Sequence, residues 1–235
     1  MFETLKSVFK VKEMRRKLLY LIWMIFVIRI GSQLPVPGVD SDFFKQWFES
    51  NTGDAFNFFD AFTGGSFTQM SIFALNITPY ITSSIVMQLL CVAIPALERM
   101  SKEEDGKKKI NKITRFVTAA LSLVTAIGYY FYLQQNGLVN YIGSSSGMKF
   151  FTAVVVIACY CAGAALIMWL GEKITENGIG NGISMILFAG IVSRIPQLVS
   201  NMVTSLSNGT LKWYTAILLV VGILAIMVFI VFITN

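Results

Sequence analysis

The most informative absence in this 235-residue sequence is histidine, which does not occur at all. Without imidazole, the chain lacks the usual general base of hydrolytic enzymes and the commonest ligand of zinc. Cysteine is scarce too, because Cys91, Cys159 and Cys161 are the only three and none belongs to a Cys-x-x-Cys pair. All three lie inside apolar runs, which argues against a disulfide framework and predicts thiols packed among apolar side chains.

Charged residues are also few. They make up 14% of the chain while 55% of its residues are hydrophobic, whereas a typical soluble domain has about 25% charged residues. The net charge of +6 suits either nucleic acid or the cytoplasmic edge of a membrane. The composition favours the membrane.

Six apolar runs approach the length of about 20 helical residues that a bilayer requires. They lie at residues 18–34, 72–94, 113–133, 150–170, 178–195 and 213–233. The fifth run is the weakest, because its strictly apolar part, 183–195, is only 13 residues long. It must recruit the glycines before it or lie inside a bundle. The predicted fold class is therefore an all-α, polytopic membrane helix bundle.

The basic residues orient these runs. Fourteen of the 19 Lys and Arg residues lie before residue 18, around the connection between the second and third runs, or at Lys173. The group around the connection includes Arg115, at the start of the third run. Positive residues concentrate on the cytoplasmic side, so the N-terminus is predicted to be cytoplasmic. A basic stretch before an apolar run is also typical of a secretory signal peptide, but no small-x-small cleavage site follows, and we expect the first run to be retained.

The segment from Ala55 to Ser71 interrupts the membrane pattern. It combines five phenylalanines with Asp60, Gln69 and the Gly64-Gly65 pair, so it cannot span a bilayer. Two interpretations remain open. The segment is either a re-entrant helix surrounded by protein or water, or an amphipathic helix lying flat on the outer leaflet.

Residues 72–94 carry hydroxyl and amide side chains where a lipid-facing helix would carry Leu and Val. Such side chains either allow close helix packing or line a water-filled path. Ile77 and Ile81 are four residues apart and therefore share one helix face. A narrow apolar collar beside a polar stretch is the functional interpretation.

Two further features are predicted to be structural. The segment Gly178-Ile-Gly-Asn-Gly182 looks like a phosphate-binding loop, but no Lys-Ser/Thr pair follows it, so a tight turn is expected. Arg29 is the only charge well inside an apolar run, and such a charge at mid-depth costs about 2.5 to 3.5 kcal/mol. We expect Arg29 to reach the outer headgroups or to bond backbone carbonyls of a neighbouring segment.

Three stretches resemble the SecY family, the central subunits of bacterial protein-translocation channels. They are RIGSQLPVPGVD at 29–40, SIFALNITPYITSSIVMQLL at 71–90 and WLGEKITENGIGNGISMILFAGIV at 169–192. The resemblance implies a ten-helix inverted-repeat bundle, of which this chain would hold helices one to six and a re-entrant plug helix. The implied divisions are a cytoplasmic N-terminus at 1–17, a five-helix half-channel at 18–195 with its plug at about 55–71, and an outer loop with the sixth helix at 196–235.

The resemblance also implies site residues. The pore ring maps to Ile77, Ile81, Ile183 and Leu187, where Leu187 departs from the Ile that the family favours. The plug maps to Phe56, Phe58, Phe59, Phe62, Gly64, Gly65 and Phe67. The lateral gate maps to Thr82, Ser83, Ile85 and Gln88.

The implied function is a channel subunit for secretion of unfolded polypeptides and lateral insertion of membrane proteins, located in the inner (plasma) membrane. Implied partners are SecE-like and SecG-like small membrane subunits, the SecA ATPase or a ribosome, a signal sequence or nascent polypeptide, the lipid bilayer, and a second chain or missing segment supplying helices seven to ten. No catalytic residue, cofactor or metal is implied. The alternative, a secondary transporter of a small solute, is disfavoured because runs two to six hold no internal Asp or Glu.

Overall fold

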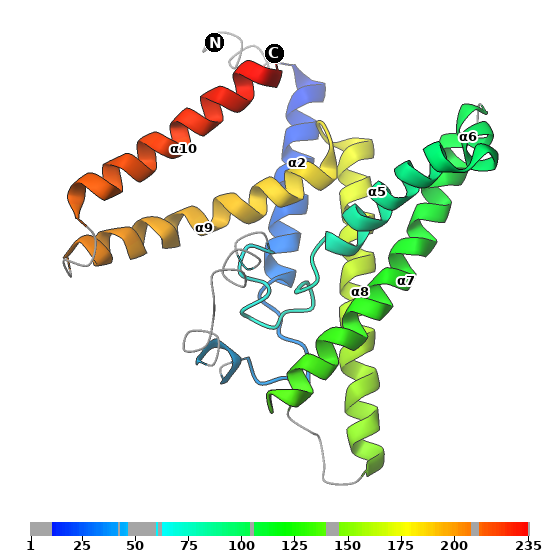
Figure 1. Ribbon diagram of the computed structural model, residues 1–235, viewed down its shortest axis with the longest axis horizontal. Coiled ribbons are helices and arrows are strands. Elements are labelled where there is room, and N and C mark those ends of the chain that lie inside the picture. Colours follow the sequence, from blue (N-terminus) through cyan, green and yellow to red (C-terminus); the bar gives the residue numbers. More distant parts are fainter. Residues whose placement is uncertain are drawn as a thin grey trace. The chain divides into compact units, whose positions relative to one another are not determined.

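Helices dominate the computed structural model, which describes residues 11–41, 43–46, 60, 63–103, 106–139, 146–207 and 212–234. In chain order the helices are α2 (Lys12–Gly31), α5 (Thr78–Ala93), α6 (Pro95–Lys102), α7 (Gly106–Gln135), α8 (Ser146–Asn177), α9 (Gly182–Ser207) and α10 (Trp213–Thr234) (Figure 1). Among the described residues, strand pairing is limited to two isolated bridges, Pro35 with Ser71 and Val39 with Val139. The predicted all-α class is confirmed.

Three of these helices, α7, α8 and α9, are long and apolar enough to cross a membrane. Helices α5 and α6 meet the same condition together, although they are bent by 103°. The bend has a local cause, because Ile94 precedes Pro95 and adopts the extended conformation that a following proline favours. The sequence pattern predicted six crossings; by length and composition, the described residues support three, or four with the bent pair.

Helix α8 is central to the first of two compact units, which ends at Ile191. It contacts α2, α5 and α7, and α7 runs beside it (Figure 1). Gly163 permits a close approach to the chain before α5, since a Cβ at this position would lie 2.0 Å from the carbonyl oxygen of Ile72. Small residues have this role in membrane bundles, where they let backbones meet.

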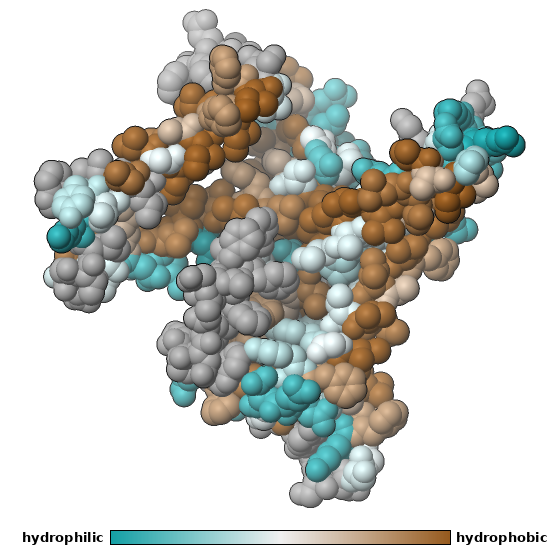
Figure 2. Space-filling view, in the orientation of Figure 1, coloured by the Kyte–Doolittle hydropathy of each residue, from teal (hydrophilic) through white to brown (hydrophobic). Residues whose placement is uncertain are grey.

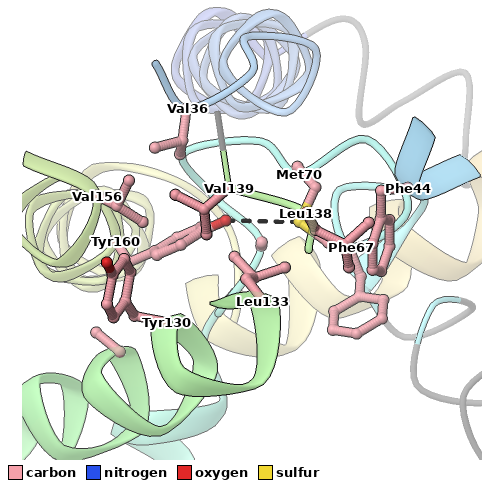
Figure 3. Packing of buried hydrophobic residues seen from close by; sticks show 12 residues of the cluster. Val36, Phe44, Phe67, Met70, Tyr130, Leu133, Leu138, Val139, Val156 and Tyr160 are labelled. Carbon is pink, nitrogen blue, oxygen red and sulfur yellow. Dashed lines mark hydrogen bonds between the residues drawn. The ribbon is translucent and has the colours of Figure 1, made fainter. Parts of the chain in front are cut away.

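An apolar cluster fills the space where α7 and α8 meet the segments around Val36 and Met70 (Figure 3). The hydroxyls of Tyr129 and Tyr160 lie 3.3 and 3.6 Å from the sulfur of Met70, and the two rings meet edge to face. Met70 is fully buried and has a φ of 50°, a left-handed conformation that is uncommon outside glycine. Packing against both tyrosines therefore holds a backbone turn in place.

The three free thiols are half-buried. Cys159 and Cys161 pack against the cluster around Met70, as their apolar neighbours in the sequence predicted.

The second unit extends from Val192 to Asn235. It holds the end of α9, which stays helical through Pro196 to Ser207, although the resemblance implied an outer loop from residue 196. It also holds α10, whose Val221–Thr234 part is a shorter apolar helix.

Apolar residues follow α5 and α10 on the surface, whereas hydrophilic residues gather near α6 (Figure 2). Such exposed apolar faces suit contact with lipid.

Replacing Gly163 with Ala should destabilise the protein by about 1 to 3 kcal/mol, because the added methyl group meets the backbone of Ile72 and forces a shift. Gly128→Ala in α7 is the matched control, since a Cβ there meets nothing within 4 Å. Thermal unfolding in detergent measures both. Equal unfolding temperatures for the two variants would contradict the close approach.

Candidate functional site

The four aliphatic residues predicted to form a ring lie in one apolar cluster. Ile77 directly precedes α5, and the amide of Ile81 donates to its carbonyl oxygen over 3.0 Å, so the two stand one helical turn apart. Ile183 and Leu187 have the same spacing in the first turns of α9. All four belong to one apolar cluster, which also includes the buried side chain of Ile186. We call Ile77, Ile81, Ile183 and Leu187 the collar.

The four collar side chains differ in how deeply they are buried. Ile77 is 1% exposed, whereas Ile81, Ile183 and Leu187 are half-buried. None of these side chains carries a hydrogen-bonding group. The surface that they share therefore excludes water without offering polar contacts to another molecule.

Gly171 of α8 lies against this cluster. A Cβ on Gly171 would lie 3.4 Å from side-chain atoms of Ile183 and Ile186 and 3.6 Å from Ile77. Gly171 is thus adjacent to collar residues from both α5 and α9. Sequence reasoning missed it, although the stretch 169–192 that resembles SecY includes it.

The turn predicted between α8 and α9 is present. The hydroxyl of Thr175 donates to the carbonyl oxygen of Gly171, and the amide of Gly182 donates to the Thr175 hydroxyl oxygen, both over 2.9 Å. Gly180 adopts a φ of +73°, which glycine tolerates without strain. The carboxamide oxygen of Asn181 accepts the amide of Ile183 and begins α9. This turn fixes the collar residues of α9 against α8.

Arg29 joins three segments near the collar. Its Nη1 donates to the carbonyl oxygen of Gly64 over 3.2 Å, and its Nη2 donates to the carbonyl oxygen of Ala189 in α9. Of the two predicted destinations, the structure selects the neighbouring backbone carbonyls. Gly64 has a φ of +65°, and a Cβ there would lie 2.7 Å from Nη1 and 3.0 Å from the Cα of Gly190. The guanidinium therefore fits only against a bare backbone.

The segment predicted to be a plug is described only in part. Phe56, Phe58, Phe59 and Phe62 lie outside the described residues. From Gly64 to Met70 the chain forms turns, so the expected helix does not include this stretch. Positive φ angles at Gly64, Gly65 and Met70 explain the difference, because a right-handed helix cannot contain them.

The described part of this segment is surrounded by protein. Phe67 is 5% exposed, and its ring centroid lies 5.8 Å from that of Phe44 and 5.4 Å from that of Tyr129. Of the two interpretations left open by the sequence, these contacts favour the re-entrant segment over a helix lying flat on lipid.

Asp60 organises the polar side of the segment. Its Oδ1 accepts the amide and the hydroxyl of Thr68, each over 3.0 Å, and its carbonyl oxygen accepts the hydroxyl of Thr63. The residue is 6% exposed. A buried carboxylate requires such donors, and sequence reasoning used Asp60 only to argue that the segment cannot span.

The predicted gate residues divide into two groups. Ser83 is fully buried, and its hydroxyl donates to the carbonyl oxygen of Thr114 in α7 over 3.0 Å. Thr82, Ile85 and Gln88 are exposed on α5. Thr82 also lines a largely apolar groove of about 560 Å³ between α5 and α7. Ser83 therefore joins two neighbouring helices, whereas the other three face outward.

No group of three side chains suited to a metal occurs in the part of the chain that the structure describes. The arrangement around the collar offers apolar surface and paired backbone groups.

Comparison with known proteins identifies related chains. The family model SecY matches residues 71–235. The protein translocase subunit SecY of Pseudomonas aeruginosa is 42% identical over 222 residues, covering 93% of this chain and 49% of that protein. The same subunit of Escherichia coli K12 is 40% identical over 228 residues, covering 94% and 50%. This chain spans about half the length of the curated relatives it matches.

Solved structures share the fold. Sec61 in the canine ribosome-channel complex from the endoplasmic reticulum has a TM-score of 0.54 at 19% identity, covering 83% of this chain and 42% of that chain. A structure described as a protein conducting channel gives the same values.

Replacing Arg29 with Met should lower the unfolding temperature in detergent, because hydrogen bonds to a charged group contribute about 1.5 to 3 kcal/mol each and two carbonyls lose their donor. Arg16→Met serves as the control, since Arg16 is exposed on the same helix. If both substitutions changed the unfolding temperature equally, Arg29 would not be the tie inferred here.

Proposed function

Because the chain belongs to the SecY family, we propose that it forms part of a protein-conducting channel, through which unfolded polypeptides cross a membrane and hydrophobic segments leave sideways into lipid. The observation that carries this proposal is the collar, in which two pairs of aliphatic residues more than a hundred positions apart in sequence belong to one cluster. Names of the relatives, a protein translocase subunit and a protein conducting channel, agree with it.

The collar has the chemistry that a reusable seal requires. Bulky aliphatic side chains in a narrow neck repel water and so hinder ions. They form no hydrogen bonds that would retain a passing peptide. We assign Ile77, Ile81, Ile183 and Leu187 to the constriction, with the half-buried members closest to the path.

The segment around Gly64 and Phe67 is assigned to the plug. Arg29 links it to Ala189 of α9, two residues after Leu187, and Phe67 packs against Tyr129 of α7. The predicted plug residues Gly64, Gly65 and Phe67 belong to its described part, and the remaining phenylalanines precede it in the chain. In this function, the plug fills the funnel outside the collar while no substrate passes.

The exposed face of α5 is assigned to the lateral gate. Thr82, Ile85 and Gln88 present one hydroxyl, one apolar and one amide group outward. The apolar side chain of Ile85 would contact a hydrophobic signal sequence. The hydroxyl of Thr82 and the amide of Gln88 would form hydrogen bonds with polar groups of a partner helix. Ser83 instead holds α5 on α7.

Partners follow from the same assignment. We propose SecE-like and SecG-like subunits and a second polypeptide segment that completes the bundle. The driving force comes from a SecA-type ATPase or a ribosome, since the sequence has no Walker A loop. The chain resides in the inner membrane with a cytoplasmic N-terminus, as the distribution of basic residues indicates. It has no enzymatic role, and nothing in its relatives supports the small-solute transporter.

Replacing Ile81 with Gly should raise the resting ion conductance of the assembled channel, because removing a collar side chain lets water enter the neck. The measurement is ion flux across liposomes that contain the channel without substrate. Val92→Gly is the control on the same helix, since Val92 is 82% exposed and outside the collar.

The substitution Ile81→Leu should keep the conductance low, because it conserves aliphatic volume. Unchanged conductance in Ile81→Gly would remove the collar from its proposed role.

A further inference from the structure

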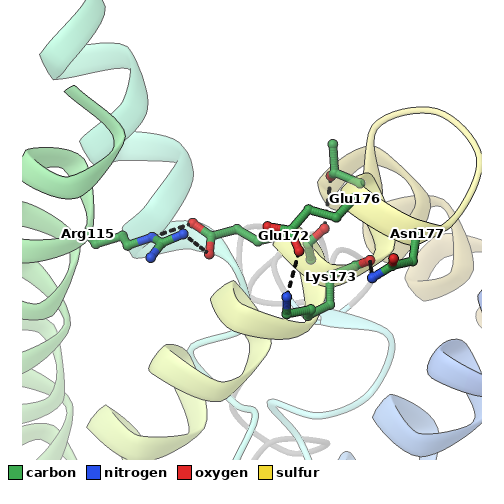
Figure 4. A network of polar contacts seen from close by, with 7 residues as sticks. Arg115, Glu172, Lys173, Glu176 and Asn177 are labelled. Atoms are coloured by element: carbon green, nitrogen blue, oxygen red, sulfur yellow. Dashed lines mark hydrogen bonds and ion pairs between the residues drawn. The ribbon is translucent and has the colours of Figure 1, made fainter. Parts of the chain in front are cut away.

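An ion pair joins α7 to α8 at the residue that follows Gly171 (Figure 4). Arg115 binds Glu172 through two contacts, Nη2 to Oε2 over 2.7 Å and Nε to Oε1 over 2.8 Å. Two parallel contacts fix the relative orientation of the two side chains, which a single contact does not. The residues are 57 positions apart in sequence, so the pair sets how two helices meet.

This pair differs from its neighbour on the same helix. Lys173 and Glu176 also form an ion pair, over 2.6 Å, but both belong to α8 and their side chains are 37% and 54% exposed. The side chain of Glu172 is 18% exposed and that of Arg115 is 51% exposed, so the carboxylate is the sheltered partner. Exposed pairs within one helix contribute little, whereas this pair has two contacts and links two helices.

Glu172 directly follows Gly171, the residue that adjoins Ile77 and Ile183. The carbonyl oxygen of Gly171 is fixed by the hydroxyl of Thr175, and Thr175 in turn fixes Gly182 at the start of α9. The pair with Arg115 holds the residue after Gly171 to α7. The part of α8 around Gly171 is therefore held by two contacts, from Thr175 to the start of α9 and from Glu172 to α7.

The residue before Arg115 holds the other collar helix. The carbonyl oxygen of Thr114 accepts the hydroxyl of Ser83, which is fully buried on α5. Consecutive residues of α7 thus bind α5 and α8, the helices that contribute Ile81 and Gly171.

We propose that Arg115 and Glu172 are positioning residues for the seal. Together with the Ser83 contact, the pair sets the spacing between α5 and α8 and keeps Gly171 against Ile77 and Ile183. Breaking the pair lets α8 move away and loosens the collar without changing any collar side chain. This inference rests on the proposed function of the collar as an ion barrier.

The test compares ion flux through the assembled channel in liposomes for Glu172→Gln and Glu176→Gln. Both substitutions remove one carboxylate from α8, four residues apart, but only the first breaks the contact with α7. We expect Glu172→Gln to raise resting conductance several-fold and Glu176→Gln to leave it at the wild-type level. The double variant Arg115→Glu with Glu172→Arg should return conductance toward the wild-type value, because it restores the pair with reversed charges.

Two further measurements distinguish a purely structural role of the ion pair from failure of the proposed function. They are the unfolding temperature of Glu172→Gln and the conductance of Ile81→Gly. If Glu172→Gln lowers the unfolding temperature but leaves conductance unchanged while Ile81→Gly raises it, the pair is only structural and this inference is wrong. If Ile81→Gly also leaves conductance unchanged, the proposed function itself fails. Should Glu172→Gln not assemble, Arg115→Gln and the charge-reversed double variant provide the same comparison, and equal conductance in the two would overturn the inference.

Discussion

The structure depends on satisfying the backbone of an irregular segment, Thr63 to Ile77, that lies among helices. Buried amide and carbonyl groups need partners, and a helix supplies its own whereas this segment cannot. Arg29 supplies donors to Gly64 and to Ala189, so one guanidinium serves both the segment and α9. The carbonyl oxygen of Met70 accepts the amide of Val36 over 2.9 Å. These contacts make an otherwise costly stretch of chain compatible with the bundle.

That segment also determines where the collar lies. It ends at Ile77, whose carbonyl oxygen accepts the first bonds of α5, so the position of the turns sets the position of the first collar residue. Gly163 and Gly171 let α8 approach the segment and the collar respectively. These two glycines leave room for the chain before α5 and for the branched side chains of the collar. Such support on three helices suits the proposed role of the collar as a seal.

Much of this arrangement follows from sequence patterns, but not all. Apolar runs predicted α7 and α8, the cost of a buried charge predicted carbonyl partners for Arg29, and the resemblance to SecY predicted the four collar residues. The turns at Met70 and Asn76 were not predictable, because a φ of 50° at such residues depends on the packing around them. Glu172 was overlooked as well, since pairing across 57 positions has no local signal. Helix α9 continues past Ile195 although Pro196 removes a helical hydrogen bond and crowds the preceding turn, so the proline did not mark the helix end.

The central claim is that the collar surrounds a polypeptide in transit, and site-specific photo-crosslinking with a stalled secretory chain tests it most directly. Leu187 and Phe188 are adjacent in α9, but Leu187 belongs to the collar cluster whereas Phe188 is 61% exposed outside it. A photoreactive side chain at 187 should crosslink to the stalled chain, and one at 188 should crosslink to lipid or to another helix. Crosslinking of the stalled chain at 188 but not at 187 would contradict the account.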